Sequence, residues 1–102
     1  MKKAIETFKL LSDETRIRTL MLLDRKEMCV CQIMGVLGVS QPMVSRNLSL
    51  LSRAGFLDER KEGKLSFYSI RRDMDEANAR VLRLLKAMVA GDERIEEDSR
   101  AL

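Results

Sequence analysis

The chain has 102 residues, of which 45% are hydrophobic and 34% are charged. This length predicts a single domain with a small hydrophobic core, which dimerisation would help to stabilise. No segment has the apolar length of a membrane span, and charges interrupt the N-terminal stretch where a signal peptide is apolar, so we expect a cytoplasmic protein without a membrane partner. The chain contains no histidine, which excludes His-ligated metal sites and His-dependent catalytic triads.

The charge is distributed unevenly along the chain. The net charge is +3, but residues 1–72 contain 14 Lys and Arg against 8 Asp and Glu, whereas residues 73–102 contain 5 against 8. A basic segment of this kind is compatible with a polyanionic partner such as nucleic acid. A modest excess also occurs on ordinary protein surfaces, so this balance serves only as support.

Two helices are predicted at the start of the chain. Apolar residues at helical spacing among charges predict a first helix over residues 2–11, which is a candidate arm for packing on a partner chain. Asp13 has the properties of an N-cap for a second helix, which continues to Leu23. Residues 24–27 form a short polar connection.

The middle of the chain has the pattern of a helix-turn-helix. Residues 28–38 predict a short third helix that ends at Gly38. Ser40 is placed as the N-cap of the next helix, Pro42 fits its first turn, and Gly55 follows its end. A short helix, a tight turn with glycine and a polar-faced helix are the elements of this DNA-binding motif.

The helix that begins after Ser40 has one apolar and one polar face. Val44, Leu48 and Leu51 recur at helical spacing and predict a buried stripe. The opposite face is small and polar and carries an arginine, so it suits the major groove of DNA, where such side chains reach base edges and phosphates. An ordinary solvated face is the alternative, and the flanking elements favour DNA binding. The predicted DNA-contacting residues of this helix are Ser40, Gln41, Ser45, Arg46, Asn47 and Ser49.

A β-hairpin follows this helix. Residues 56–60 and 65–70 are predicted as two strands, joined by a tip over residues 61–64 in which Gly63 is free to adopt a positive φ. Two strands alone are marginally stable, so one face of the hairpin must lie on the helices. A basic hairpin beside a helix-turn-helix is the wing of a winged helix, and a solvated turn is the alternative. The wing residues predicted to contact phosphates or the minor groove are Arg60, Lys61 and Lys64.

The chain ends with a long amphipathic helix and an acidic segment. Asp73 is the predicted N-cap of a helix over about residues 74–90, whose continuous apolar stripe needs a partner surface. Packing within the domain is one solution, but the apolar side of the first helix favours a two-fold dimer interface. We therefore expect one domain over residues 1–90 and a frayed, flexible tail over residues 91–102. The predicted dimer residues are Ile5, Phe8, Val81, Leu84, Leu85 and Met88.

Cys29 and Cys31 are the only cysteines, and a reducing cytoplasm would keep them as free thiols. Residues two apart on a regular helix point about 200° away from each other, so these thiols can hold one ion only if the first turn of their helix is frayed or extended. Soft thiolates favour soft metals and metalloids. Two alternatives remain open: the cysteines are small buried hydrophobes, or they sense oxidants.

The order of these elements, together with their motifs, resembles the ArsR/SmtB family of metal- and metalloid-responsive repressors. The resemblance covers roughly residues 3–90. It rests on Leu-Ser-Asp-Glu-Thr-Arg at 11–16, Glu-Met-Cys-Val-Cys at 27–31, Ser-Gln-Pro-Met-Val-Ser-Arg-Asn-Leu at 40–48, and Gly-Phe-Leu at 55–57 with Gly-Lys at 63–64. It implies a mainly α-helical winged helix-turn-helix with a two-stranded β-hairpin, which dimerises through its first and last helices. It also implies a homodimer that represses transcription on a palindromic double-stranded operator and is released by an inducer.

The Cys-Val-Cys motif resembles the arsenite/antimonite site of the arsenic-responsive branch. The resemblance therefore implies As(III) or Sb(III) at Cys29 and Cys31, with no permanent cofactor and no enzymatic activity. Bound metalloid would distort the start of the third helix and so disturb the recognition helix that it supports.

The sequence departs from the family pattern in three respects. Met34 occupies the position of a third cysteine, and Asn47 replaces a common histidine. The family's zinc site on the last helix requires histidine ligands, and this chain has no histidine, so we expect that site to be absent. The missing third cysteine keeps a thiol-based redox-sensing repressor open, and a repressor of another soft metal is also an alternative. Hypotheses from other classes are a thiol enzyme or metal carrier that uses Cys29 and Cys31, and a winged helix that binds only proteins.

Overall fold

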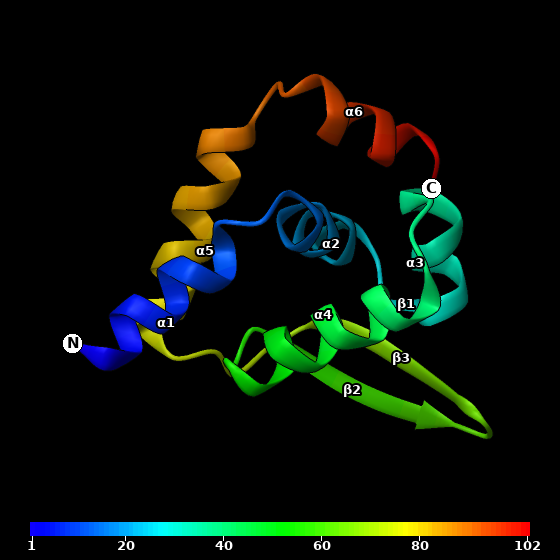
Figure 1. Cartoon of the computed structure of the whole chain (residues 1–102), viewed down its shortest axis with the longest axis horizontal. Helices are drawn as coiled ribbons and strands as arrows, with labels where there is room; N and C mark the ends of the chain where they lie inside the picture. The colour runs from blue at the N-terminus through cyan, green and yellow to red at the C-terminus, as the bar shows by residue number, and fades with distance from the viewer.

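The computed structural model describes all residues, 1–102. The elements follow in the order α1 (Lys2–Leu11), α2 (Glu14–Arg25), β1 (Met28–Cys29), α3 (Val30–Leu37), α4 (Gln41–Arg53), β2 (Leu57–Glu62), β3 (Leu65–Ile70), α5 (Glu76–Val89) and α6 (Glu93–Arg100). Helix α2 lies at the centre, and the other helices and the hairpin surround it (Figure 1). The predicted winged helix-turn-helix is confirmed. No helix combines the length and the apolar character that a membrane crossing requires.

The hydrophobic core is built on α2. Leu20 and Leu22 of this helix are at most 1% exposed, and they belong to one cluster that also includes side chains of α3, α4 and β2. The predicted stripe of α4 is part of this cluster, because Val44, Leu48 and Leu51 are at most 2% exposed. Burial of this stripe orients α4, so its polar face is directed to solvent.

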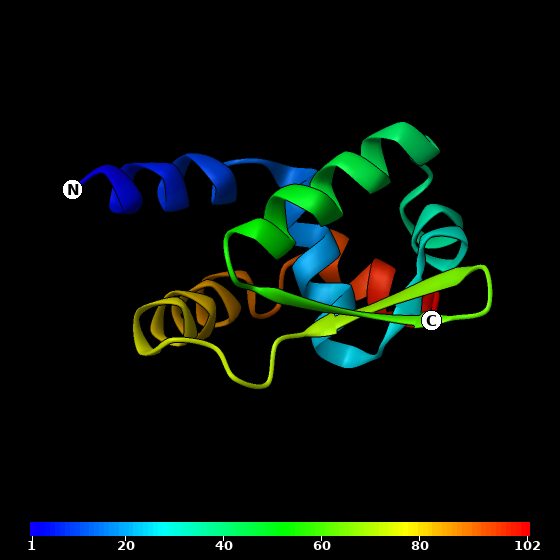
Figure 2. The ribbon, with the colours of Figure 1, turned by 90° about the horizontal axis from the view of Figure 1, so that it is seen from below.

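A third, short strand extends the hairpin into a sheet of order β1-β3-β2. Figure 2 shows the hairpin from the side, with α4 above it. The prediction of a helix from residue 28 is wrong at its start, because Met28 and Cys29 pair antiparallel with Tyr68 and Phe67 of β3. The local pattern of two consecutive buried residues fits a strand as well as a helix. Here the residues form a strand because they pair with the edge of β3, which is distant in sequence.

The N-cap of α5 is Asp75 and not the predicted Asp73. The Asp75 side chain accepts a hydrogen bond from the Asn78 backbone N–H at 2.8 Å. Asn78 is buried, and its Nδ2 donates to the carbonyl oxygen of Ala54 at 2.8 Å. This contact with the end of α4 determines where α5 begins, and it is not visible in the local pattern of residues 73–78.

The acidic segment after Gly91 forms helix α6, so the prediction of a frayed, flexible tail is wrong. Its N-cap, Asp92, accepts hydrogen bonds from two backbone N–H groups of the first turn. Asp98 forms a bidentate ion pair with Arg18 of α2, with both N–O distances at 2.8 Å, and the two side chains are only 7% and 9% exposed. Ile95 packs against the core. Taken alone, the charges of this segment predict a solvated chain. The prediction fails because the partner of Asp98 lies 80 residues earlier and is not visible in the local sequence.

Gly55 is expected to be intolerant of a side chain. Its φ is +91°, and a Cβ at this position would lie 3.1 Å from Nδ2 of Asn78. Gly55→Ala should therefore lower the free energy of unfolding by about 1–3 kcal/mol, measured by denaturant titration. Gly35→Ala is the matched control, because Gly35 lies inside α3 with no atom within 4 Å of the added Cβ. That change should raise stability by about 0.5–1 kcal/mol, and equal effects of the two would contradict this account.

Candidate nucleic-acid interface and thiol site

The polar face of α4 is formed by a regular set of exposed side chains. The Ser40 hydroxyl caps the helix by accepting from the Met43 backbone N–H at 3.4 Å. The exposed residues of this face are Ser40, Gln41, Ser45, Arg46 and Ser49. No carboxylate of the chain forms an ion pair with Arg46, so its guanidinium is free for an external acceptor. Small polar groups around one arginine suit the edges of bases and the phosphates of a major groove.

The turn before α4 has the predicted geometry. Helix α3 ends at Gly38, which adopts the left-handed conformation with φ +68° and donates its N–H to the Met34 carbonyl oxygen at 2.8 Å. This conformation reverses the chain, and α3 then packs against α4. Helix α3 therefore directly supports the helix with the exposed polar face.

Asn47 does not belong to this face, which corrects its predicted role in contacting DNA. It is 4% exposed, and its Oδ1 accepts from Nη1 of Arg16 at 3.4 Å. Arg16 in turn donates from Nε to the carbonyl oxygen of Leu10 at 2.6 Å and so bridges α1 and α4. The signal was present in the sequence, because residue 47 lies three positions after Val44 and four before Leu51, on the buried stripe.

The wing separates into free and paired cations. Lys61 and Lys64 are exposed and form no ion pair within the chain. The second strand has the predicted range, whereas the first continues to Glu62 beyond its predicted end at residue 60, so the turn is reduced to Gly63 and Lys64. Gly63 has φ +61°, as expected for this tight turn. Lys61 and Lys64 are therefore the wing cations available to phosphates.

Arg60 forms ion pairs within the protein although its side chain is 51% exposed, so its DNA contact stays a prediction and would have to compete with these pairs. Its Nη2 and Nε lie 2.9 and 3.2 Å from the two carboxylate oxygens of Glu27, and its Nη1 lies 2.7 Å from Glu62. The guanidinium also lies over the Phe67 ring, 4.8 Å from its centroid. The hydrogen bond with Arg60 lowers the pKa of Glu27, and the bonds to Glu27 and Glu62 raise the pKa of Arg60. The pair is thus fully charged at neutral pH.

We expect Lys61→Ala or Lys64→Ala to weaken DNA binding equally for all sequences. Each substitution removes one phosphate contact per subunit, so the slope of log K against log salt should become shallower by about one for each phosphate that is no longer neutralised. The measurement is fluorescence anisotropy with specific and random DNA at several salt concentrations. Lys9→Ala makes the same charge change on α1, at the opposite end of the molecule from the wing tip (Figure 1), and should leave the slope unchanged. A change confined to specific DNA would contradict a phosphate contact.

The two cysteines lie on opposite sides of the boundary between β1 and α3. Cys29 has extended backbone angles, φ −90° and ψ 170°, and is the N-cap residue of α3. Its N–H donates to Oε1 of Gln32 at 3.0 Å. Cys31 is in the first helical turn. Because Cys29 lies outside the helix, the opposed directions of a regular helix do not apply to this pair.

The thiols also differ in burial. Cys29 is 7% exposed, whereas Cys31 is exposed, and both are free. Met34 is half-buried and packs against the core. No group of three or more His, Cys, Asp or Glu side chains in the chain is arranged to hold a metal ion. An ion bound by both thiolates would thus take further ligands from solution.

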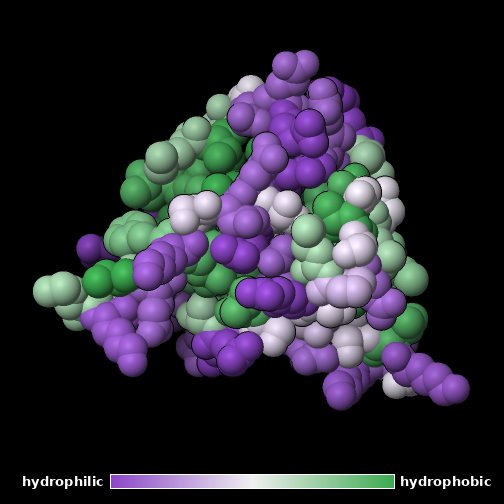
Figure 3. Space-filling model, in the orientation of Figure 1, coloured by the Kyte–Doolittle hydropathy of each residue, from purple (hydrophilic) through white to green (hydrophobic).

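The predicted dimer residues fall into two groups. Four are exposed although they are apolar, and Figure 3 shows such hydrophobic side chains along α5. They are Ile5, Phe8, Leu84 and Met88. Val81 and Leu85 are partly buried and pack against the core of their own chain. The exposed apolar surface is therefore continuous with the core but is not covered by this chain.

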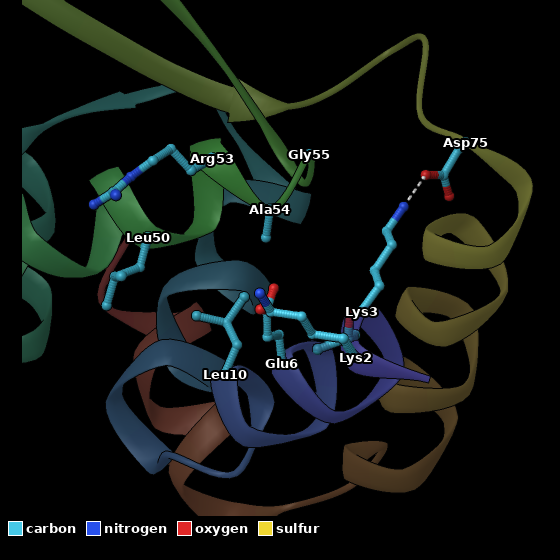
Figure 4. A pocket seen from close by; sticks show the side chains of 10 residues that line it. Lys2, Lys3, Glu6, Leu10, Leu50, Arg53, Ala54, Gly55 and Asp75 are labelled. Atoms are coloured by element: carbon cyan, nitrogen blue, oxygen red, sulfur yellow. Dashed lines mark hydrogen bonds and ion pairs between the residues drawn. The ribbon is translucent and has the colours of Figure 1, made fainter.

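One surface pocket is lined by charged side chains and is distant from the thiols. It lies between α1, the end of α4 and the start of α5, and it is lined by charged side chains that include Lys2, Lys3 and Arg53 (Figure 4). Lys3 forms an ion pair with Asp75 at 3.1 Å. The Asn78 backbone N–H and Lys3 together lower the pKa of Asp75. This pocket contains no soft ligand, so it is not a candidate site for a thiophilic ion.

A helix-turn-helix with an exposed polar face, followed by a hairpin with free lysines, defines the winged helix-turn-helix class of proteins. Residues 13–59 match the family model described as bacterial regulatory protein, arsR family. The chain belongs to the ArsR family, as its motifs predicted. This is a family of bacterial helix-turn-helix regulatory proteins.

Individual relatives agree with this assignment. The chain is 45% identical over 67 residues to the arsenical resistance operon repressor of Escherichia coli, a match that covers 65% of this chain and 57% of that protein. It is 44% identical over 70 residues to the HTH-type transcriptional regulator MJ1325 of Methanocaldococcus jannaschii, covering 68% and 79%. Among solved structures, a homodimeric winged helix-turn-helix DNA-binding domain from Mycobacterium bovis has a TM-score of 0.72 at 26% identity, covering 90% and 82%.

Proposed function

We propose that this protein is a homodimeric transcriptional repressor, which binds a palindromic operator and releases it when As(III) or Sb(III) binds Cys29 and Cys31. The observation that carries the DNA-binding part is the exposed face of α4, where the unpaired Arg46 lies among small polar side chains. The free lysines of the wing add phosphate contacts beside it. The relationship to an arsenical resistance operon repressor supports this function.

The exposed apolar side chains of α1 and α5 support the homodimer. Phe8 is 63% and Met88 is 73% exposed in the single chain, which is unfavourable for large apolar groups in a contiguous patch. A two-fold interface would bury the same patch on both subunits. It would also present two α4 helices to successive half-sites of a palindrome. The Mycobacterium bovis domain with this fold is described as homodimeric.

The thiol pair supports a soft inducer. Cys29 and Cys31 flank the start of α3, and α3 packs against α4. An ion that draws both sulfurs together changes the start of α3 and, through it, the orientation of α4. By linkage, the inducer must bind the free protein more tightly than the DNA-bound protein. Water or a small thiol would complete the coordination of As(III).

The test is an operator-binding titration in which three candidate inducers are compared. Operator DNA from upstream of the gene is bound by the wild type, Cys29→Ser and Cys31→Ser, and arsenite, zinc or peroxide is then added. We expect arsenite to release the wild type, and each substitution to abolish release while operator affinity without inducer is kept. Release by peroxide alone would favour a redox sensor, and release by zinc alone would favour another metal. An unchanged arsenite response in both variants would show that the thiol assignment is wrong.

A further inference from the structure

The register of the sheet connects the thiol segment with the wing. Cys29 of β1 is paired with Phe67 of β3, and Phe67 is paired on its other side with Arg60 of β2. The three residues form one row across the sheet, and side chains in one row point to the same face. The Arg60 guanidinium lies over the Phe67 ring at 4.8 Å. One strand, β3, therefore lies between the strand of the buried thiol and the strand that carries this cation of the wing.

A second connection spans the same strands. Glu27 precedes β1 by one residue, and its carboxylate receives two hydrogen bonds from Arg60, at 2.9 and 3.2 Å. Bidentate geometry of this kind fixes orientation as well as distance. Strand β1 has only two residues, so this ion pair is an additional contact between the thiol segment and the wing beside the short strand pairing.

Cys29 must leave this arrangement in order to share an ion with Cys31. Cys29 is 7% exposed behind the β1–β3 pairing, whereas Cys31 is already exposed. Cys29 is paired with Phe67 of β3, so separation of β1 from β3 would release the backbone of Cys29, and the Glu27–Arg60 ion pair would connect that separation to the wing.

We propose that the Glu27–Arg60 ion pair couples the position of the wing to the accessibility of Cys29. Opening of β1 displaces the wing from its DNA-binding position, and a wing held on DNA keeps Cys29 buried. The role of this coupling in inducer action rests on the proposed function. The coupling between the wing and Cys29 does not, because it is a property of the protein without inducer. Arg60 is then a positioning residue.

The coupling is tested by the alkylation rate of Cys29 with iodoacetamide in a Cys31→Ser background. Glu27→Gln and Arg60→Gln should each accelerate alkylation about two- to five-fold, the range that an exposed ion pair of good geometry supports. A mere electrostatic effect on the thiolate would move the two rates in opposite directions, because the substitutions change the local charge with opposite sign. Glu62→Gln is the matched control, since it removes the other partner of Arg60 within the wing and should leave the rate unchanged. Unchanged or oppositely changed rates in the first two variants would overturn the proposal.

A second measurement relates the coupling to the inducer. In the protein with both cysteines, the ratio of operator dissociation constants with and without saturating arsenite should fall about two- to five-fold in Glu27→Gln and stay unchanged in Glu62→Gln. A ratio that is equal in the two variants would overturn the coupling as a route of inducer action. If arsenite never releases the wild type but both alkylation rates rise as expected, the proposed inducer is wrong and the coupling stands.

Discussion

Arg46→Ala should weaken specific operator binding by about 10- to 100-fold, which corresponds to roughly 1.4–2.7 kcal/mol in total for the base contacts that the arginine no longer makes. Arg46 is exposed in the second turn of α4, and no carboxylate of the chain competes for it. Residues near the N-terminus of a recognition helix are those that reach base edges. Fluorescence anisotropy with operator and with random DNA, at constant salt, measures both affinity and sequence preference.

Arg53→Ala is the matched control for this experiment. Arg53 belongs to the same helix and the substitution makes the same charge change, but the residue lies in the last turn and lines the groove beside α1 (Figure 4). We expect at most a small, sequence-independent decrease in affinity. Equal decreases in the two variants would indicate a general charge effect, and undiminished operator binding by Arg46→Ala would contradict the proposed interface.

Asp98→Ala should lower the free energy of unfolding by about 3 kcal/mol, because it leaves the Arg18 guanidinium buried without a partner. For a domain of this size the melting temperature should fall by about 10 °C or more. Helix α6 is attached to α2 through this ion pair and the packing of Ile95. We therefore also expect the amide protons of α6 to lose their protection in hydrogen exchange.

Glu97→Ala serves as the control for Asp98→Ala. Glu97 is its neighbour on the same helix, but its side chain is 52% exposed and its ion pair with Arg94 is long, at 3.9 Å. This substitution should change stability by less than about 0.5 kcal/mol. The double variant Arg18→Met with Asp98→Leu should recover most of the stability that Asp98→Ala removes, since it eliminates both buried charges. A wild-type melting temperature in Asp98→Ala would show that α6 is not held by this pair.

Helix α2 is more than the centre of the core, since its charged side chains connect distant elements. Arg16 bridges the carbonyl oxygen of Leu10 and the side chain of Asn47, and Arg18 binds Asp98. Both arginines are anchored by acceptors from other helices, so α1, α4 and α6 are positioned against a common element. This arrangement gives the α4 face a fixed relation to the apolar surface of α1.

The helix-turn-helix, the wing and the faces of the long helices could all be predicted from the amino-acid sequence. These features depend on local signals: the Ser40 cap and Pro42 at the start of α4, the left-handed Gly38 before it, and the turn at Gly63. Caps, turns and helical periodicity act within one or two turns of the chain, so a single sequence is sufficient to recognise them.

Which polar groups are partnered and which remain free depends on contacts between segments that are distant in the sequence. Asn47 and Arg60 are of residue types that commonly contact DNA. In the structure Asn47 is hydrogen-bonded to Arg16, and Arg60 is ion-paired with Glu27. The β1 strand and the α6 helix likewise depend on partners far along the chain, the edge of β3 and Arg18. Ion pairs and strand edges form between segments brought together by burial of the core, and no periodicity within a segment encodes the identity of its partner.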